Sequence, residues 1–307
     1  MSFKIIKKGL ADSIQDNGRY GYQHLGIPPA GCMDIFSAWL ANKILGNNLY
    51  DAVFEFHFPS SQIIFEKEYT ICITGANFVP VINDKSVELN TPINVHANDK
   101  LTMLQPIEGR TSYMAVCGNL NNPVWLGSQS YSRQSIQNED MFEFQAKKEI
   151  NKEATVAKKS GYKLLIETMQ KWVFDYHSPI RIIPGAAWSH LNEASAVAIL
   201  NNTFTVTSQA NRMGFQLAGT KLSLTIPNNF LSSGVTRGTL QLLPSGEIIV
   251  LMADHQTIGG YANLGQIILV DLPRFAQLKT GQSFHFALTD LDNANQLYRN
   301  MYEKFQH

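Results

Sequence analysis

The feature that most constrains this chain is a motif that occurs twice. One copy lies in residues 15–34 and the other in residues 209–219, and both contain Gln, Asn, Arg, Gly, an aromatic residue and Gln in that order. The first copy has one additional glycine, and its arginine, Arg19, lies 193 residues before Arg212. The repeat indicates a duplication, so the sequence predicts two similar halves. A chain of 307 residues is long enough for two domains.

Composition excludes several classes of protein. The 25 basic residues balance 25 acidic ones, which argues against nucleic acid or an anionic membrane as the main partner. The longest apolar run, 248–253, is far shorter than the roughly 18 residues that span a bilayer. The N-terminus lacks the apolar segment of a signal peptide. Three distant cysteines, Cys32, Cys72 and Cys117, form no disulfide framework or zinc spacing, so we expect a cytoplasmic protein without a metal site.

Residue patterns predict a mainly β chain with a few short helices. Expected strands are 3–7, 52–56, 62–65, 70–74, 100–104, 111–116, 163–166, 181–183, 203–208, 239–243, 247–253 and 266–272. Expected helices are 35–45 between an Asp34 cap and Gly46, 190–200 after a Ser189 cap, and a last helix that begins at Thr289. The charged stretch 146–160 predicts a boundary between an N-terminal lobe, 1–160, and a C-terminal lobe, 161–307.

The first copy of the motif carries one set of candidate residues. Asp16 and Arg19 flank a glycine turn, so their side chains can meet. They form either an ion pair that stabilises the loop or an arginine presented to a carboxylate or phosphate. Asp34 is either a helix cap or a functional carboxylate.

A second set follows the apolar run 247–253, where a rigid strand leads into polar residues and a glycine turn. These residues are Asp254, His255, Gln256, Thr257, Gly259, Gly260 and Tyr261. His255 is either a general base or a hydrogen-bonded structural histidine. Residues 232–241, which end in Gln241, are either an anion-binding loop or a hairpin connection. The chain contains no Walker A, Rossmann, zinc-protease or nucleophile-elbow motif.

These same stretches resemble the 5-oxoprolinase subunit-C family, which is also described as allophanate hydrolase subunit 2-like, KipI-antagonist (KipA-like) or biotin-dependent carboxyltransferase. The matching segments follow the family's order along nearly the whole chain. They lie at 14–21, 26–28, 31–34, 41–42, 46–47, 54–55, 74–76, 126–128, 211–214, 238–241 and 254–261.

The resemblance implies two cyclophilin-like β-barrel lobes and a component of an ATP-dependent complex that opens the lactam of 5-oxoproline to glutamate. It implies ATP, with Mg, as a cofactor of the complex, and phosphorylation of the amide oxygen before water attacks. The implied partners are a subunit-B-like (KipI-like) protein, a subunit-A-like (LamB/YcsF-like) protein and a small lactam or amide. Two alternatives remain open: a regulatory protein that antagonises a KipI-like kinase inhibitor, and a carboxyltransferase module that uses carboxybiotin carried by another protein.

On the family motifs, Asp16, Arg19, Asp34 and Asp254 are the expected catalytic residues. The expected substrate-binding residues are Arg212, Gln241, His255, Gln256, Thr257, Gly259, Gly260 and Tyr261. One segment departs from the family: residues 131–140 contain no glycine, whereas the family has a glycine-rich loop there, although Arg133 matches the loop's arginine. This departure allows a different ligand, or none.

Overall fold

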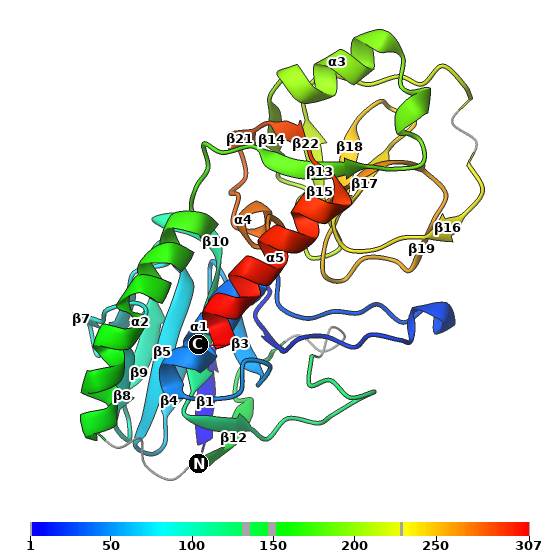
Figure 1. Ribbon diagram of the computed structural model, residues 1–307. Helices are drawn as coiled ribbons and strands as arrows, with labels where there is room; N and C mark the ends of the chain where they lie inside the picture. Colours follow the sequence, from blue (N-terminus) through cyan, green and yellow to red (C-terminus); the bar gives the residue numbers. More distant parts are fainter. Residues whose placement is uncertain (1, 131–135, 147–151, 228–229, 307) are drawn as a thin grey trace. The chain divides into compact units, whose positions relative to one another are not determined.

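The computed structural model describes residues 2–130, 136–146, 152–227 and 230–306, with backbone alone at 146 and 152–161 (Figure 1). The chain forms two compact units. The first comprises Met1–Arg19 and Ala30–Phe174, and the second comprises Tyr20–Pro29 and Asp175–His307. The prediction of a mainly β chain is confirmed. Residue 160, where we expected the boundary, lies inside a helix, so the chain passes to the second unit later, after Phe174.

Two sheets build the first unit. One has the strand order β11-β12-β1-β4-β9-β6-β7 and the other β2-β3-β10-β5-β8. Their bounds are β1 (Ser2–Lys7), β2 (Ser13–Gln15), β3 (Val53–His57), β4 (Gln62–Phe65), β5 (Tyr69–Asn77), β6 (Pro80–Ile82), β7 (Lys85–Ser86), β8 (Pro92–Val95), β9 (Lys100–Met103), β10 (Glu108–Val116), β11 (Gly118–Leu120) and β12 (Met141–Ala146).

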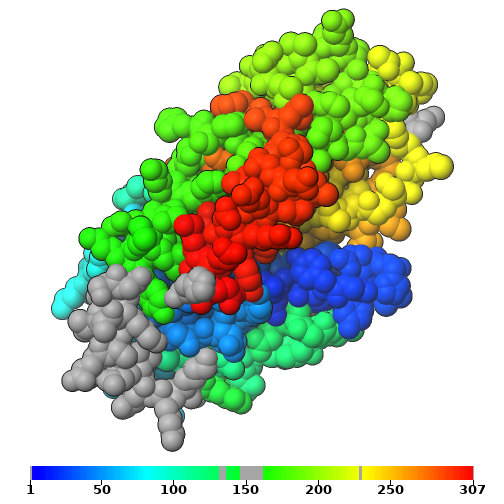
Figure 2. Space-filling model, viewed as in Figure 1, coloured from blue at the N-terminus to red at the C-terminus, as the bar shows by residue number. Residues whose placement is uncertain are grey.

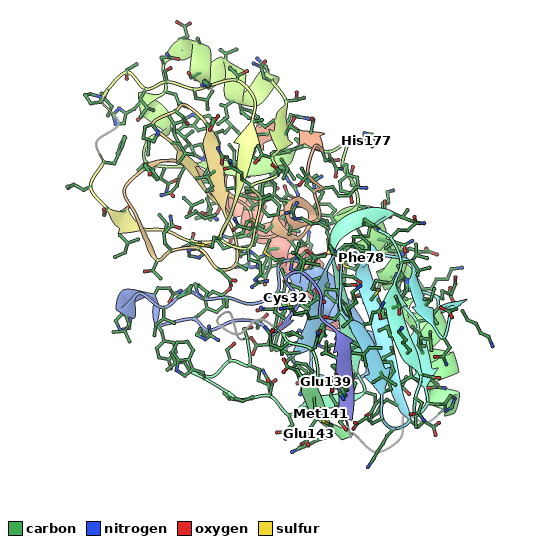
Figure 3. All side chains as sticks on the ribbon, turned by 180° about the vertical axis from the view of Figure 1, so that it is seen from behind. Cys32, Phe78, Glu139, Met141, Glu143 and His177 are labelled. Atoms are coloured by element: carbon green, nitrogen blue, oxygen red, sulfur yellow. The ribbon has the colours of Figure 1, made fainter. Side chains whose placement is uncertain are left out.

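Aromatic side chains fill the space between these sheets. Phe3 contacts Phe54, Phe65 and Phe144, with ring centroids 5.8, 6.2 and 5.1 Å away. The period of two along β12 directs Phe144 inward and leaves Met141 exposed; Figure 3 labels Met141 with its neighbours Glu139 and Glu143. Strand β12 thus contributes one apolar face to the core of the unit.

Helix α1 (Ile35–Leu45) begins and ends where the sequence predicts. The Asp34 carboxylate accepts a hydrogen bond from the Ser37 backbone N–H at 3.0 Å, and Gly46 ends the helix in the left-handed conformation at φ 71°. Every residue of α1 except Ile35 and Lys43 is buried, so the helix contributes to the core of the first unit rather than to its surface.

Helix α2 (Lys152–Val173) corrects the strand predicted at 163–166. Leu165, Met169 and Val173 are buried and lie four residues apart, which is the spacing of one helix face. The apolar residues within 163–166 are therefore part of a helical pattern that continues to Val173, beyond the predicted strand.

The second unit is built on one eight-stranded sheet with the order β21-β14-β15-β18-β17-β20-β13-β22. Its strands pair antiparallel except β13 with β22. A separate two-stranded ribbon pairs β16 with β19. The bounds are β13 (Ile180–Pro184), β14 (Phe204–Val206), β15 (Gly214–Ala218), β16 (Ser233–Gly234), β17 (Thr239–Leu242), β18 (Ile248–Leu251), β19 (Ile258–Gly259), β20 (Ala262–Ile267), β21 (Ser283–Phe284) and β22 (Phe286–Leu288).

Three sequence predictions in this unit need correction, and the third concerns the last helix. Asn192, not Ser189, caps helix α3 (Glu193–Asn201), because its side chain accepts the Ser195 N–H at 2.8 Å, while a short 3-10 helix η2 (Trp188–His190) precedes it. The strand expected at 266–272 ends at Ile267. Residues 268–271 form a turn, and helix α4 (Leu272–Ala276) follows with a proline in its first turn.

The last helix, α5 (Leu291–Gln306), begins after Asp290 rather than at Thr289, because the Asp290 carboxylate accepts the Asn293 N–H at 2.8 Å. Ala294, Met301 and Phe305 of α5 are buried, whereas Leu291 is exposed. Helix α5 is visible in red in Figure 2.

Candidate functional site

Asp16 is the centre of a hydrogen-bond network in the first unit. Its carboxylate accepts hydrogen bonds from the Gly18 N–H at 2.8 Å and from the Ser128 hydroxyl, the Gln129 N–H and the Ser130 hydroxyl, each at 2.6 Å. The Asp16 N–H in turn donates to the Ser130 hydroxyl at 2.9 Å. This carboxylate therefore joins residues 16–18 to residues 128–130, two of the family motifs that lie more than 100 positions apart.

Arg19 continues the same network. Its guanidinium donates to the Ser130 carbonyl and lies over the Trp125 ring, 4.7 Å from the ring centroid. Only 2% of Arg19 is exposed. The next ten residues, Tyr20–Pro29, group with the second unit and contain a short 3-10 helix η1 (Gln23–Leu25).

Asp34 lies in a buried polar cluster that also contains Glu55 and Tyr113. The Tyr113 hydroxyl accepts the Asp34 N–H at 2.6 Å, and Glu55 accepts the Met33 N–H at 2.8 Å. Burial, together with the Glu55 and Asp34 carboxylates, raises the pKa of Tyr113 well above 10.0, so this phenol stays neutral. Cys32, labelled in Figure 3, is buried just before this cluster.

Sequence reasoning assigned no role to Glu55 or Tyr113. A signal for Glu55 was present: it is a charged residue between the buried aromatic residues Phe54 and Phe56. Glu55 Oε1 also lies 3.1 Å from Nε2 of His57 in the same strand. The cap role of Asp34, one of its two predicted interpretations, is confirmed.

In the second unit, Arg212 and Asp254 form a bidentate pair. Arg212 Nε lies 2.8 Å from Asp254 Oδ2, and Nη2 lies 2.9 Å from Oδ1. The Asp254 N–H also donates to the Arg212 carbonyl at 2.8 Å. Both side chains are largely buried, and this fork geometry holds the carboxylate in one orientation. The second copy of the motif thus meets the end of strand β18.

His255 and Gln256 extend this arrangement. His255 is only 1% exposed, and its Nδ1 lies 2.5 Å from the Gln256 carbonyl. Burial, helped by the charge of Arg237, lowers the pKa of His255 below 6.5, against the opposing effects of the Gln256 carbonyl and Asp254. A carbonyl only accepts hydrogen bonds, so the neutral imidazole carries its proton on Nδ1 and leaves Nε2 as an acceptor.

Gln241 joins the cluster from strand β17. It is fully buried, and its Oε1 accepts a hydrogen bond from Gln256 Nε2 at 3.2 Å. Gly259 lies against the other end of this amide: a Cβ at Gly259 would stand 2.2 Å from Gln241 Nε2. Gly259 pairs with Ser233 in the β16–β19 ribbon, which therefore covers Gln241.

The remaining predicted residues lie around this ribbon. Thr257 is buried, and its carbonyl accepts the Val235 N–H at 3.1 Å, whereas Gly260 and Tyr261 are exposed. Residues 232–241 are not a hairpin connection, because β16 pairs with β19 whereas β17 pairs with β18 and β20. Between β16 and β17 the chain makes a turn in which the Thr239 N–H donates to the Thr236 carbonyl at 3.1 Å.

The described residues of each unit therefore bring together one predicted set. Asp16, Arg19 and Asp34 lie in the first unit, and residues 212, 241 and 254–261 lie in the second. Among the described residues, no three His, Cys, Asp or Glu side chains group in a way that could hold a metal ion. No helix in the same part of the chain has the length and apolarity to cross a membrane. Residues 131–135 of the departing loop, Arg133 included, lie outside the described residues.

The order of the segments matches a known family. A family model described as "Carboxyltransferase domain, subdomain A and B" matches residues 25–288. The chain belongs to this family. It is 30% identical to the subunit-C protein of the Escherichia coli K12 5-oxoprolinase, over 95% of this chain and 92% of that protein. It is 29% identical to the subunit-C protein of the Haemophilus influenzae 5-oxoprolinase, over 94% of this chain and 91% of that protein.

A solved structure shows the same fold. The K. lactis urea amidolyase matches 99% of this chain with a TM-score of 0.86 at 21% identity. The match covers 20% of the length of that protein, so the same fold also occurs as part of a longer chain.

Proposed function

We propose that this chain is the subunit-C component of an ATP-dependent 5-oxoprolinase, which opens the lactam of 5-oxoproline to glutamate. The observation that carries the proposal is the extent of the match: the chain covers 92% of the subunit-C protein of the E. coli 5-oxoprolinase, but 17% of the Saccharomyces cerevisiae urea amidolyase. Activity then requires partners, a subunit-B-like (KipI-like) protein and a subunit-A-like (LamB/YcsF-like) protein.

The geometry of the second unit supports a role in amide chemistry. Arg212 fixes Asp254 through two hydrogen bonds, which suits Asp254 to orient an attacking water. In this proposal Arg212 is a positioning residue rather than a direct ligand of the substrate. His255 is neutral near pH 7, because its pKa is lowered, and its Nε2 can accept a proton from that water. Water adds to the carbonyl carbon, the ring C–N bond breaks, and the nitrogen takes up a proton to become the amine of glutamate.

The same residues do not fit a nucleotide triphosphate. A triphosphate with its metal needs uncompensated cations and carboxylate ligands, but Asp254 already neutralises Arg212. The described residues also contain no group of three metal-ligating side chains. We therefore assign ATP and Mg to the assembled complex.

A second candidate is carboxyl transfer, with carboxybiotin supplied by another protein. It is favoured by the description of the matching family model and by the likeness to the Kluyveromyces lactis urea carboxylase, which has a TM-score of 0.85 over 99% of this chain.

The test is ATP hydrolysis by the chain alone, and by the chain mixed with its two proposed partners, with and without 5-oxoproline. We expect 5-oxoproline to stimulate hydrolysis, with release of glutamate, only in the mixture. Carboxylation of urea by a mixture that contains a biotin carboxylase and carboxybiotin carrier, without glutamate release from 5-oxoproline, would establish the second candidate instead.

A further inference from the structure

Strands β17 and β20 place two carboxamide side chains side by side. Gln241 and Asn263 are direct partners in this antiparallel ladder, just beyond an irregularity between Leu240 and Gln241. Directly opposite residues lie on the same face of a sheet with Cβ atoms about 4.5–5.5 Å apart. The two amide groups can therefore contact one small ligand.

Each of these carboxamides has one buried atom without a partner among the described residues. These atoms are Nε2 of Gln241, which is a donor, and Oδ1 of Asn263, which is an acceptor. Gln256 Nε2 donates a hydrogen bond to Oε1 of Gln241. This hydrogen bond fixes the orientation of the Gln241 amide, so Nε2 is the atom left without a partner. A buried polar atom without a hydrogen bond is energetically unfavourable, so this adjacent donor and acceptor need an explanation.

A third carboxamide on the same two strands provides a comparison. Gln266 lies opposite Thr239, and its Oε1 accepts hydrogen bonds from the Thr236 and Thr239 hydroxyls at 3.1 and 3.0 Å. Its Nε2 donates to the carbonyls of Arg237 and Ile267 at 2.6 and 3.3 Å. This sheet can thus satisfy both ends of the half-buried Gln266 carboxamide, whereas it leaves one donor of Gln241 and one acceptor of Asn263 without a hydrogen bond.

Glycines lie next to both unpartnered atoms. A Cβ at Gly259 would stand 2.2 Å from Gln241 Nε2, and a Cβ at Gly185 would stand 2.5 Å from Asn263 Oδ1. Any other residue at either position would contact the unpartnered atom. Gly259 belongs to the β16–β19 ribbon, which has only two paired positions. Displacing this ribbon from Gln241 therefore breaks few hydrogen bonds.

We propose that Gln241 and Asn263 form the lactam-recognition pair of the substrate site. Gln241 Nε2 donates to the carbonyl oxygen of the ligand, and Asn263 Oδ1 accepts from its ring N–H. A small lactam is a cis amide, so it presents both groups on one edge, whereas a carboxylate presents no N–H there. This inference rests on the proposed function, and it adds Asn263 as a substrate-binding residue and selectivity for a cis amide.

The test compares four variants in the assembled complex. Gln241→Met removes the donor, Asn263→Leu removes the acceptor, and Asn263→Asp keeps an acceptor. Gln296→Met makes the same chemical change as the first variant at an exposed position of α5 and serves as the control. We measure the KM and kcat for 5-oxoproline and, by calorimetry, the binding of 5-oxoproline and of proline, which has the same ring without the carbonyl.

We expect Gln241→Met and Asn263→Leu to raise the KM for 5-oxoproline by about 10- to 100-fold. Proline has no ring carbonyl, so its binding should be unchanged in Gln241→Met, whereas Asn263→Leu should weaken it because proline keeps the ring N–H. The KM of Asn263→Asp for 5-oxoproline should stay within about threefold of the wild type. A variant that merely folds less well has fewer active molecules, which lowers kcat and leaves KM unchanged.

The outcomes separate this inference from the proposed function. Turnover of 5-oxoproline by the wild type with an unchanged KM in both Gln241→Met and Asn263→Leu would overturn the recognition pair alone. Binding of 5-oxoproline that both variants lose, in a complex that never turns it over, would support the pair and overturn the proposed function. A wild type that neither binds nor turns over 5-oxoproline would overturn both.

Discussion

The substitution Gly259→Ala tests whether the β16–β19 ribbon lies directly on Gln241. The new Cβ would stand 2.2 Å from Gln241 Nε2, 3.1 Å from Val235 Cγ1 and 3.2 Å from Gln241 Cδ. Gln241 is fully buried and bonded to Gln256, so it cannot move away without loss of that hydrogen bond. Overpacking of this kind costs about 1–3 kcal/mol. For a chain of this size, about 2 kcal/mol lowers the midpoint of thermal unfolding by roughly 4–8 °C.

The adjacent glycine is a matched control. A Cβ at Gly260 would have only Ser232 Oγ at 3.3 Å and the Phe230 carbonyl at 3.9 Å as its nearest contacts. Differential scanning calorimetry should therefore show a shift close to zero for Gly260→Ala. In addition, Gly259→Ala combined with Gln241→Ala should be more stable than the sum of the two single changes predicts, because the truncation removes the clash. Equal midpoints for the two glycine variants would refute the described contact.

Three further predictions concern stability. Arg212→Ala should cost about 2–4 kcal/mol in denaturant unfolding, because it leaves the Asp254 carboxylate unpaired, and simultaneous Asp254→Ala should recover part of the loss; additive losses would contradict the pairing. Asp34→Ala should cost about 1–2 kcal/mol through loss of the α1 cap, and Asp34→Asn clearly less, so equal losses would argue against capping. Since the folded-state pKa of His255 is lowered, its contribution to stability is complete above its ordinary pKa of 6.5 and is lost as pH falls through the lower folded-state value. Unfolding midpoints from pH 7.5 to 5 should fall more steeply for the wild type than for His255→Gln, and parallel profiles would contradict the shift.

The sequence alone predicts elements whose signals are local. Helix α1 has its cap residue, its apolar spacing and its terminal glycine in consecutive positions, and all three act as predicted. Strand β4 (Gln62–Phe65) is likewise found at the predicted residues. In both elements, the neighbouring residues carry no signal for a different secondary structure.

Errors occur where the deciding residues lie further away. The run 163–166 suits a strand by itself, but the burial of Leu165, Met169 and Val173 follows the period of a helix of 22 residues. At 266–272 the apolar run 267–270 concealed the turn that precedes Pro273. Short apolar runs do not distinguish these cases, because period and length decide them together.

The residues of the candidate site also divide into those that the local sequence predicts and those whose role depends on distant contacts. The Arg212–Asp254 pair joins two motifs that the sequence singled out, yet nothing local shows that they meet, since the contact depends on the pairing of β15 with β18. Asn263 was not predicted, because its importance depends on an unpartnered atom opposite Gln241, and only a three-dimensional structure shows that.

The grouping of Tyr20–Pro29 with the second unit has a consequence for the synthesis of the chain. The polypeptide passes between the units three times, after Arg19, Pro29 and Phe174. During translation the first unit can be complete once residue 174 has left the ribosome, whereas Tyr20–Pro29 emerges early and waits for residues 175–307. A gene fragment that begins at residue 175 therefore lacks a piece of the unit it encodes, and a cut between the halves does not yield two whole folding units.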